Sequence, residues 1–231
     1  MSLAGKGAVA IWHDIAPEGR AEFYKWHGNE HMPERAGITG FLRGRRYIAV
    51  DGSAPEYFNL YETESPSTLT GPDYLARLNN PTPWTVATVK HFRGVARSLC
   101  AVAASYGAGQ GGLIATFRYA VDESRAQAHR QGMADLALPR VAQLPGVAGS
   151  HLLIADEAAS AVETVEKKVR AEKNLIPRWI VLIESWDDVE PFMALCGELA
   201  QDAAFADATS APTVSVYRLQ NSRSKLPGSA A

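Results

Sequence analysis

The chain has 231 residues, of which 46% are hydrophobic and 21% charged, as in ordinary soluble globular proteins. This length is enough for one large domain or two small ones with a proper core. The net charge of −2 gives no electrostatic reason to expect nucleic acid or an anionic membrane as a partner. Apolar runs fall short of the ~18 residues that a membrane span needs, and the two cysteines, Cys100 and Cys196, are expected to stay reduced. We therefore expect a cytoplasmic protein.

The first half of the chain predicts elements in the order β-α-β-β-α-β. A helix opens at Pro17 and runs to Met32, where Pro33 is expected to end the regular helix. The other expected elements are strands at 8–12, 41–50, 57–62 and 95–104, a helical region over 65–78, and a helix capped by Thr82 that runs to about 91.

The second half repeats this pattern. Its expected strands are 113–119, 150–155, 178–184 and 213–219, and its expected helices are 124–141 and 189–205. A shift of 106 residues places Pro33 on Pro139 and Gly40 on Gly146, and a longer loop over 156–177, expected to be mobile, raises the later shift to 122. We therefore predict a first unit at 1–106, a Gly-rich linker at 107–112, a second unit at 113–221 and a disordered tail at 222–231.

The β-α-β-β-α-β order is typical of a ferredoxin-like unit, a four-stranded antiparallel sheet with helices on one face. Two such units would bury their open sheet faces against each other. The sequence thus predicts an α+β fold in which tandem duplicated ferredoxin-like units form one α/β barrel.

The segment 24–47 holds the densest set of groups able to exchange a proton. His27 and His31 are four residues apart, so on a helix they point the same way, with Glu30 beside them. At the shift of 106 residues, the motif residues Trp26, His27, Glu30 and His31 become Gly132, Met133, Leu136 and Ala137. This loss favours a functional role in the first half, although a structural role of His31 at the helix end is the alternative.

This motif, W-H-x-x-E-H-x-P followed by a T-G-F turn and an R-R-Y strand, resembles the dimeric α/β-barrel superfamily, and within it the EthD-like and related uncharacterised branches. The matching residues are Trp26, His27, Glu30, His31, Pro33, Gly40, Phe41, Arg46 and Tyr47. The resemblance implies that two units line one barrel, by dimerisation or by fusion. Members of this superfamily include small monooxygenases, aromatic polyketide cyclases, lactone isomerases and haem-degrading enzymes. The resemblance therefore implies a pocket without fixing a reaction.

A metal site is the competing interpretation of the two histidines, since His27 to His31 matches the H-x-x-E-H pattern of inverted zinc peptidases. Zinc needs a third protein ligand, yet Asp73 is the one acidic residue between Glu64 and Asp122. The sequence also lacks a dinucleotide fingerprint and a cysteine cluster. We therefore predict no metal and no cofactor, so that purified protein should lack flavin and bound iron.

The preferred function is a cofactor-independent enzyme acting on an aromatic or enolisable small molecule. In this hypothesis His31 is the general base, oriented by Glu30 or His27. Arg46 or Tyr47 would stabilise an oxyanion. The expected ligand-binding residues are Trp26, Trp12, Phe41 and Trp84. A non-catalytic small-molecule binder and a structural protein are the alternatives, and self-association through further surfaces stays open.

Overall fold

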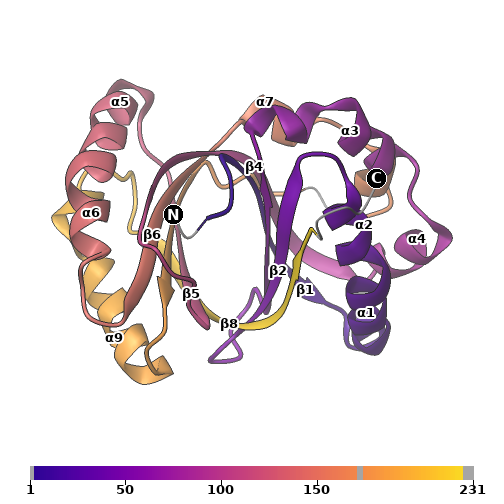
Figure 1. Cartoon of the computed structure of the whole chain (residues 1–231), viewed down its shortest axis with the longest axis horizontal. Helices are drawn as coiled ribbons and strands as arrows, with labels where there is room; N and C mark the ends of the chain where they lie inside the picture. The colour runs from indigo at the N-terminus through magenta and orange to yellow at the C-terminus, as the bar shows by residue number, and fades with distance from the viewer. Residues whose placement is uncertain (1–2, 171–173, 226–231) are drawn as a thin grey trace.

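In the computed structural model, which describes residues 3–170 and 174–225, eight antiparallel strands close into one barrel (Figure 1). The order around the barrel is β1-β3-β2-β8-β5-β7-β6-β4. The strands are β1 Gly7–Ile15, β2 Phe41–Ala49, β3 Tyr57–Thr63, β4 Phe92–Tyr106, β5 Leu113–Tyr119, β6 Val147–Ala155, β7 Trp179–Ser185 and β8 Thr213–Ser224. A single chain therefore supplies both sheets of the barrel.

Helices cover the barrel from two opposite sides (Figure 1). One layer contains α1 Arg20–Trp26, α2 Met32–Gly37, α3 Pro72–Asn79, α4 Pro83–Val89, α7 Glu157–Ala161 and α8 Val165–Lys168. The other contains α5 Glu123–Gly132, α6 Leu138–Val141 and α9 Val189–Leu199. The first layer thus includes two short helices, α7 and α8, from the second half of the chain. None of the described helices is long and apolar enough to cross a membrane.

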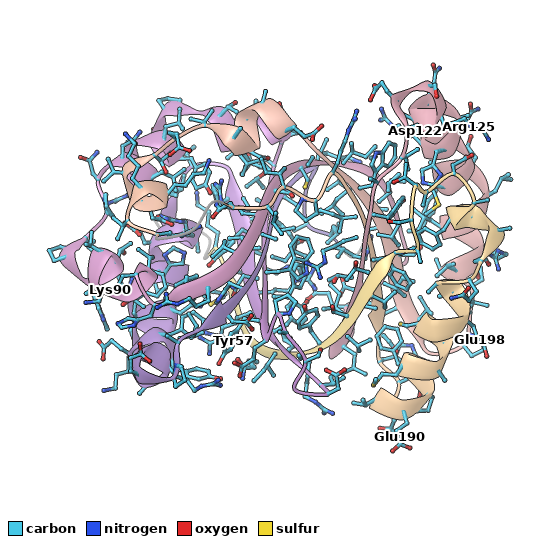
Figure 2. The ribbon with its side chains drawn as sticks, turned by 180° about the vertical axis from the view of Figure 1, so that it is seen from behind. Tyr57, Lys90, Asp122, Arg125, Glu190 and Glu198 are labelled. Carbon is cyan, nitrogen blue, oxygen red and sulfur yellow. The ribbon has the colours of Figure 1, made fainter. Side chains whose placement is uncertain are left out.

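Side chains fill the barrel between the two helix layers, while Glu190 and Glu198 of α9 lie on the outer side (Figure 2). The alternation of strand residues divides the core between the barrel interior and its outer face. Apolar residues such as Phe58 occupy much of the interior. Arg45 crosses it, contacting Glu184 at 2.8 Å and Glu62 at 3.0 Å. These charges can be buried because each has an ionic partner.

The two halves share the order of their elements, except for α7 and α8 between β6 and β7, and the same local distortions. Each places a five-residue π-helical turn, His27–His31 or Met133–Ala137, directly before a short α-helix whose second residue is a proline. Gly40 and Gly146 precede equivalent strands at φ values of 81° and 79°. Such left-handed conformations favour glycine, since a Cβ atom would crowd the following backbone.

The structure corrects several local predictions. Pro33 does not end the helix, because the wide π turn lets the amide of Met32 reach the carbonyl of His27 and the chain continues as α2 to Gly37. Residues 222–224 belong to β8 rather than to a tail, and residues 226–231 lie outside the described part. The segment 156–177 is no open loop, because its described residues include two helices that pack on the first half. Cys100 and Cys196 are both buried and are not joined by a disulfide.

Candidate active site

A small cavity lies between the outer face of the barrel and the helix layer that contains α1 and α2. Its free volume is about 20 Å³, which is room for about one water molecule. Ile11, Asn59 and Tyr61 line it from the sheet, and Trp26 and His31 line it from the helix side. The cavity is therefore buried under the first-half helices and is separate from the barrel interior.

The π-helical turn brings the two histidines of the motif together at the cavity. The ring centroids of His27 and His31 are 5.4 Å apart, and the ring of Trp26 lies 4.3 Å from that of His31. The histidine residues are only 2% and 7% exposed. A π turn carries about one residue more than an α turn, so residues four apart nearly superimpose along its axis. Local helix geometry thus places both imidazoles against the sheet.

Both imidazoles are neutral at pH 7, because burial lowers each pKa well below 6.5. For the pKa of His27 the next largest cause is repulsion from a protonated His31. For the pKa of His31 it is repulsion from the charged guanidinium of Arg35. The Nε2 atom of His27 is 3.2 Å from the hydroxyl of Tyr61. The Nδ1 atoms of both rings are buried and have no hydrogen-bond partner within the described part of the chain. The site therefore holds two imidazoles with unused hydrogen-bonding capacity.

Glu30 does not orient His31 directly. Its carboxylate accepts hydrogen bonds from the hydroxyls of Thr82 at 2.6 Å and Thr85 at 3.3 Å. The same Thr85 hydroxyl accepts the indole N–H of Trp26 at 3.1 Å. Glu30 thus fastens the π-helical turn to the start of α4, so its role is to position the helix that carries the histidines.

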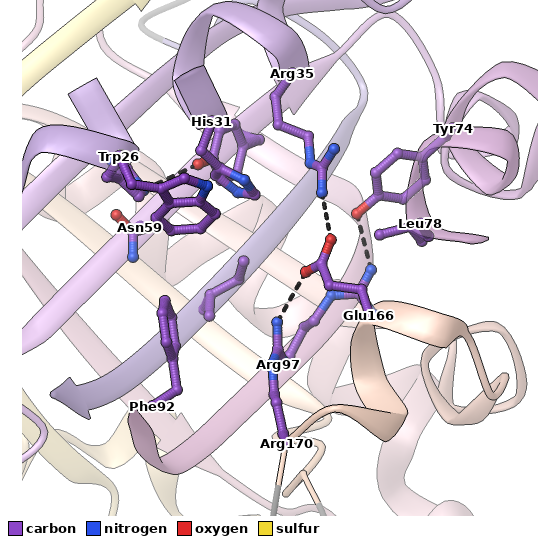
Figure 3. Close-up of a pocket in the computed structure, with 13 residues that line it drawn as sticks. Trp26, His31, Arg35, Asn59, Tyr74, Leu78, Phe92, Arg97, Glu166 and Arg170 are labelled. Carbon is purple, nitrogen blue, oxygen red and sulfur yellow. Dashed lines mark hydrogen bonds and ion pairs between the residues drawn. The ribbon is translucent and has the colours of Figure 1, made fainter. Parts of the chain in front are cut away.

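The wall opposite the histidines is strongly charged (Figure 3). Glu166 accepts a hydrogen bond from Arg35 at 2.6 Å and another from Arg170 at 3.0 Å. Arg97 donates to the hydroxyl of Tyr74 at 2.8 Å. Burial alone would raise the pKa of Glu166, but Arg35, Arg170 and Arg97 lower it below its ordinary value. Glu166 is therefore ionised at neutral pH.

Two residues predicted for the site face the other side of the sheet. Tyr47 and Trp12 belong to the core inside the barrel, and the indole of Trp12 donates to Thr116 there at 3.1 Å. Neighbouring residues of a strand point to opposite faces, so Arg46 lies outside while Tyr47 lies inside. Tyr47 and Trp12 therefore cannot share a ligand with His31 in this structure.

The remaining predicted residues lie on the helix-covered face with different contacts. Trp26 lines the cavity. Arg46 sits beyond it, with its guanidinium carbon 4.8 Å from the ring centre of Tyr24. Phe41 packs behind the wall, 5.1 Å from the ring of Tyr74, and the indole of Trp84 donates to Glu22 at 2.6 Å. Arg46 and three other arginines on the strands, Arg43, Arg45 and Arg97, are all buried rather than at a solvated sheet edge.

Sequence reasoning predicted only three of the thirteen residues that line the cavity, Trp26, His27 and His31. The ten others include the polar residues Asn59, Tyr61, Arg35, Arg97, Glu166 and Arg170. Alternation along β3 offered a signal for Asn59 and Tyr61, which share the outer face with Tyr57. The Glu166 and Arg170 pair has helical spacing, but such pairs are usually solvated. Nothing local connects that pair to the motif.

Comparison with known protein families and with curated proteins finds no match. Solved structures do match over nearly their whole length. An anthrone oxidase-like protein matches with a TM-score of 0.64 and 14% identity, over 97% of this chain and 96% of that one. A monooxygenase-like protein from Lactobacillus acidophilus matches with a TM-score of 0.56 and 10% identity, over 95% of this chain and 97% of that one. A mutant chlorite dismutase from Candidatus Nitrospira defluvii matches with a TM-score of 0.54 and 10% identity, over 93% of this chain and 90% of that one. These similarities concern the fold alone, and they confirm the expected dimeric α/β-barrel architecture.

The family that the sequence motif resembles includes haem-degrading enzymes, but the cavity beside His31 does not fit haem. Its free volume of about 20 Å³, with about 80 Å³ in an adjoining cavity, is far below the ~300 Å³ at which pockets for larger ligands begin. Within the described residues, no cluster of three His, Cys, Asp or Glu side chains could hold a metal ion. No catalytic step is therefore assigned to haem or to a metal.

Proposed function

We propose that this protein is a small-molecule enzyme that moves a proton without a cofactor, with His31 as the base. The observation that carries the proposal is the buried Nδ1 atom of His31, which has no hydrogen-bond partner among the described residues and belongs to a side chain that lines the cavity. A buried polar atom without a partner costs free energy, and a ligand that supplies the partner recovers it. The names of the neighbouring structures, anthrone oxidase-like and monooxygenase-like, support an enzyme on this fold.

The chemistry that these groups can perform is enolisation. The neutral imidazole of His31 takes a proton from a carbon next to a carbonyl group, and the electron pair of the C–H bond forms the enolate. The developing charge on the oxygen is stabilised by the guanidinium of Arg35 or by the hydroxyl of Tyr61, both in the cavity wall. The imidazolium then returns the proton to another position, which completes an isomerisation without a net change in atoms or electrons.

A non-catalytic binding protein is the second candidate, and the electrostatics of the cavity favour it. A general base works best when its pKa lies near the pH of the medium, whereas burial lowers the pKa of His31 well below 6.5. An imidazole with such a low pKa is a weak base until a ligand changes its surroundings. Turnover, rather than binding, therefore distinguishes the two candidates.

The test is deuterium exchange into two enolisable one-ring probes, neutral benzoylacetone and anionic phenylpyruvate, followed by mass spectrometry at pH 7. The parent should accelerate exchange of at least one probe, and His31→Gln should lower that rate by about 100-fold or more. His129→Gln is the matched control, because His129 is also buried and lies 3.0 Å from a tyrosine hydroxyl, but in the opposite helix layer. Equal rates for the parent and His31→Gln, or no acceleration with either probe, would contradict the proposal.

We also infer that the chain arose by tandem duplication and that the site survives only in the first unit. The matching π-helical turns and the matching glycines, Gly40 and Gly146, support the duplication. In the second unit Met133 and Ala137 occupy the positions of the two histidines, so the chemistry proposed here is restricted to the first. Membership of the EthD-like branch stays a prediction from the motif.

A further inference from the structure

The cavity carries more positive than negative charge. Three guanidinium groups, from Arg35, Arg97 and Arg170, line it against the single carboxylate of Glu166 among the described lining residues. Arg35 and Arg97 are 3% and 9% exposed, and Glu166 is 5% exposed. A buried charge is costly unless it is paired. Just outside the lining, Glu34 also pairs with Arg35, at 3.2 Å, so the three arginines face two carboxylates. The cavity therefore keeps an excess of positive charge.

Glu166 uses these arginines incompletely. It accepts one bond from Arg35 and one from Arg170 (Figure 3), although a guanidinium group can donate two parallel bonds to one carboxylate. The Nε atom of Arg170 is buried without a hydrogen-bond partner in the part of the chain that the structure describes. Glu166 therefore bridges two arginines with one hydrogen bond each, whereas a free carboxylate could accept two parallel hydrogen bonds from a single arginine.

Two of the arginines are fixed by the first half, independently of Glu166. The hydroxyl of Tyr74 accepts a hydrogen bond from Arg97 at 2.8 Å, and its ring centre lies 5.9 Å from the guanidinium carbon of Arg35. Glu166, in contrast, reaches the cavity from α8, 131 positions beyond Arg35 in the sequence. Arg35 and Arg97 would therefore keep their places if Glu166 withdrew.

An apolar space adjoins the charged wall. A second cavity of about 80 Å³ shares Leu78 and Arg97 with the first and is otherwise lined mainly by aliphatic side chains, among them Leu75 and Leu99. A ligand that places an anionic group on the arginines could extend an apolar body toward this space. The two cavities together offer about 100 Å³, which excludes a body larger than one aromatic ring.

We propose that the ligand of this site is a carboxylic acid with an apolar, one-ring body, and that its carboxylate takes the place of Glu166 on Arg35 and also binds the neighbouring Arg97. The inference rests on the proposed function for the location of the ligand site and adds the class of ligand to it. Glu166 then holds the arginines in the free protein, and an incoming acid exchanges with it at constant charge.

The test uses benzoate and its neutral analogue benzamide in calorimetric titrations of the full chain. Glu166→Gln keeps the shape of the side chain but removes the competing charge, so its affinity for benzoate should rise by about tenfold or more over the parent. Glu157→Gln, an exposed position on the same segment, should bind benzoate as the parent does. Benzamide should bind all three proteins more weakly than benzoate binds Glu166→Gln.

A second measurement needs no variant. In the parent, saturating benzoate should speed amide hydrogen exchange in Val165–Lys168, because Glu166 leaves its arginines, whereas benzamide should not. Equal binding of benzoate and benzamide, an unchanged benzoate affinity in Glu166→Gln, or unchanged exchange in α8 overturns the proposal. If benzoate binds but neither probe is turned over, the proposed function fails and the protein is a carrier for acids. If benzoylacetone is turned over but benzoate does not bind, the proposed ligand class fails and the protein is an enzyme for neutral substrates.

Discussion

Acidification should destabilise this protein through His13, a third buried histidine behind the candidate site. Its Nε2 atom is 2.9 Å from the amide nitrogen of Asn59, and its Nδ1 atom is 3.3 Å from the carbonyl of Asp14. The neutral ring satisfies both neighbours by accepting one hydrogen bond and donating the other. Burial is the main reason that the pKa of His13 falls from 6.5 to about 3.

The size of the effect follows from this difference in pKa. Below pH 6.5 the unfolded chain binds a proton at His13 that the folded chain does not bind, so the free energy of unfolding falls as the pH falls. One pH unit corresponds to about 1.4 kcal/mol. His13 should therefore cost about 3 kcal/mol of stability at pH 4.5, and the loss should level off near pH 3. Above pH 6.5 its contribution is constant.

The assay is urea unfolding at pH 7.0 and at pH 4.5, followed by tryptophan fluorescence. His13→Phe retains an aromatic ring among Phe23, Tyr57 and Phe92, which contact the imidazole, but it cannot bind a proton. The variant loses the hydrogen bond to Asn59 at both pH values, so that fixed cost cancels in the comparison. Acidification should cost the variant about 3 kcal/mol less than the parent. The same loss in both proteins would refute the assignment of a strongly lowered pKa to His13.

Two further predictions concern the barrel and its turns. Glu184→Gln should lower the free energy of unfolding at pH 7 by about 3 kcal/mol, because it removes one partner of buried Arg45. Burial opposes the ionised form of Glu184, but His151 and Arg45 hold its pKa at about 2. The difference in stability from the parent should therefore vanish as the pH falls from 4.5 to about 2, and a constant difference would contradict this prediction. Gly40→Ala and Gly146→Ala should each lower stability by about 1–2 kcal/mol, since both φ values are positive and an added Cβ would lie within 2.8 Å of a neighbouring side chain. The control is Gly37→Ala, where a Cβ meets nothing within 4 Å. If thermal unfolding shows either variant to be as stable as Gly37→Ala, the argument is wrong.

The order of elements could be predicted from the sequence because it depends on local interactions. Strand alternation, prolines at helix starts and glycines at turns act within a few residues. The predicted strands 41–50 and 113–119 lie within one residue of β2 and β5. The helix end at Pro33 was mispredicted, because a π-helical turn accommodates a proline that an α-helix of regular pitch would exclude.

The motif itself could also be located, since spacing along one helix places His27 and His31 together. Strand alternation also places Arg46 and Tyr47 on opposite faces of the sheet. It could not tell which sheet face lies inside a barrel, so Tyr47 and Trp12 were grouped with His31 although they point the other way. Both faces of these strands are buried, and the polarity pattern that normally marks the inner face is therefore missing.

Only the tertiary structure decided that a charged segment of the second half completes the site of the first. Glu166 and Arg170 carry the helical spacing of an ordinary solvated ion pair, and no local preference distinguishes them from one. Closure of the barrel sets β6 beside β4, and the chain leaving β6 then crosses to the first helix layer, where Glu166 meets Arg35. Contacts between residues so distant in sequence depend on how the whole chain packs, and no local pattern encodes them.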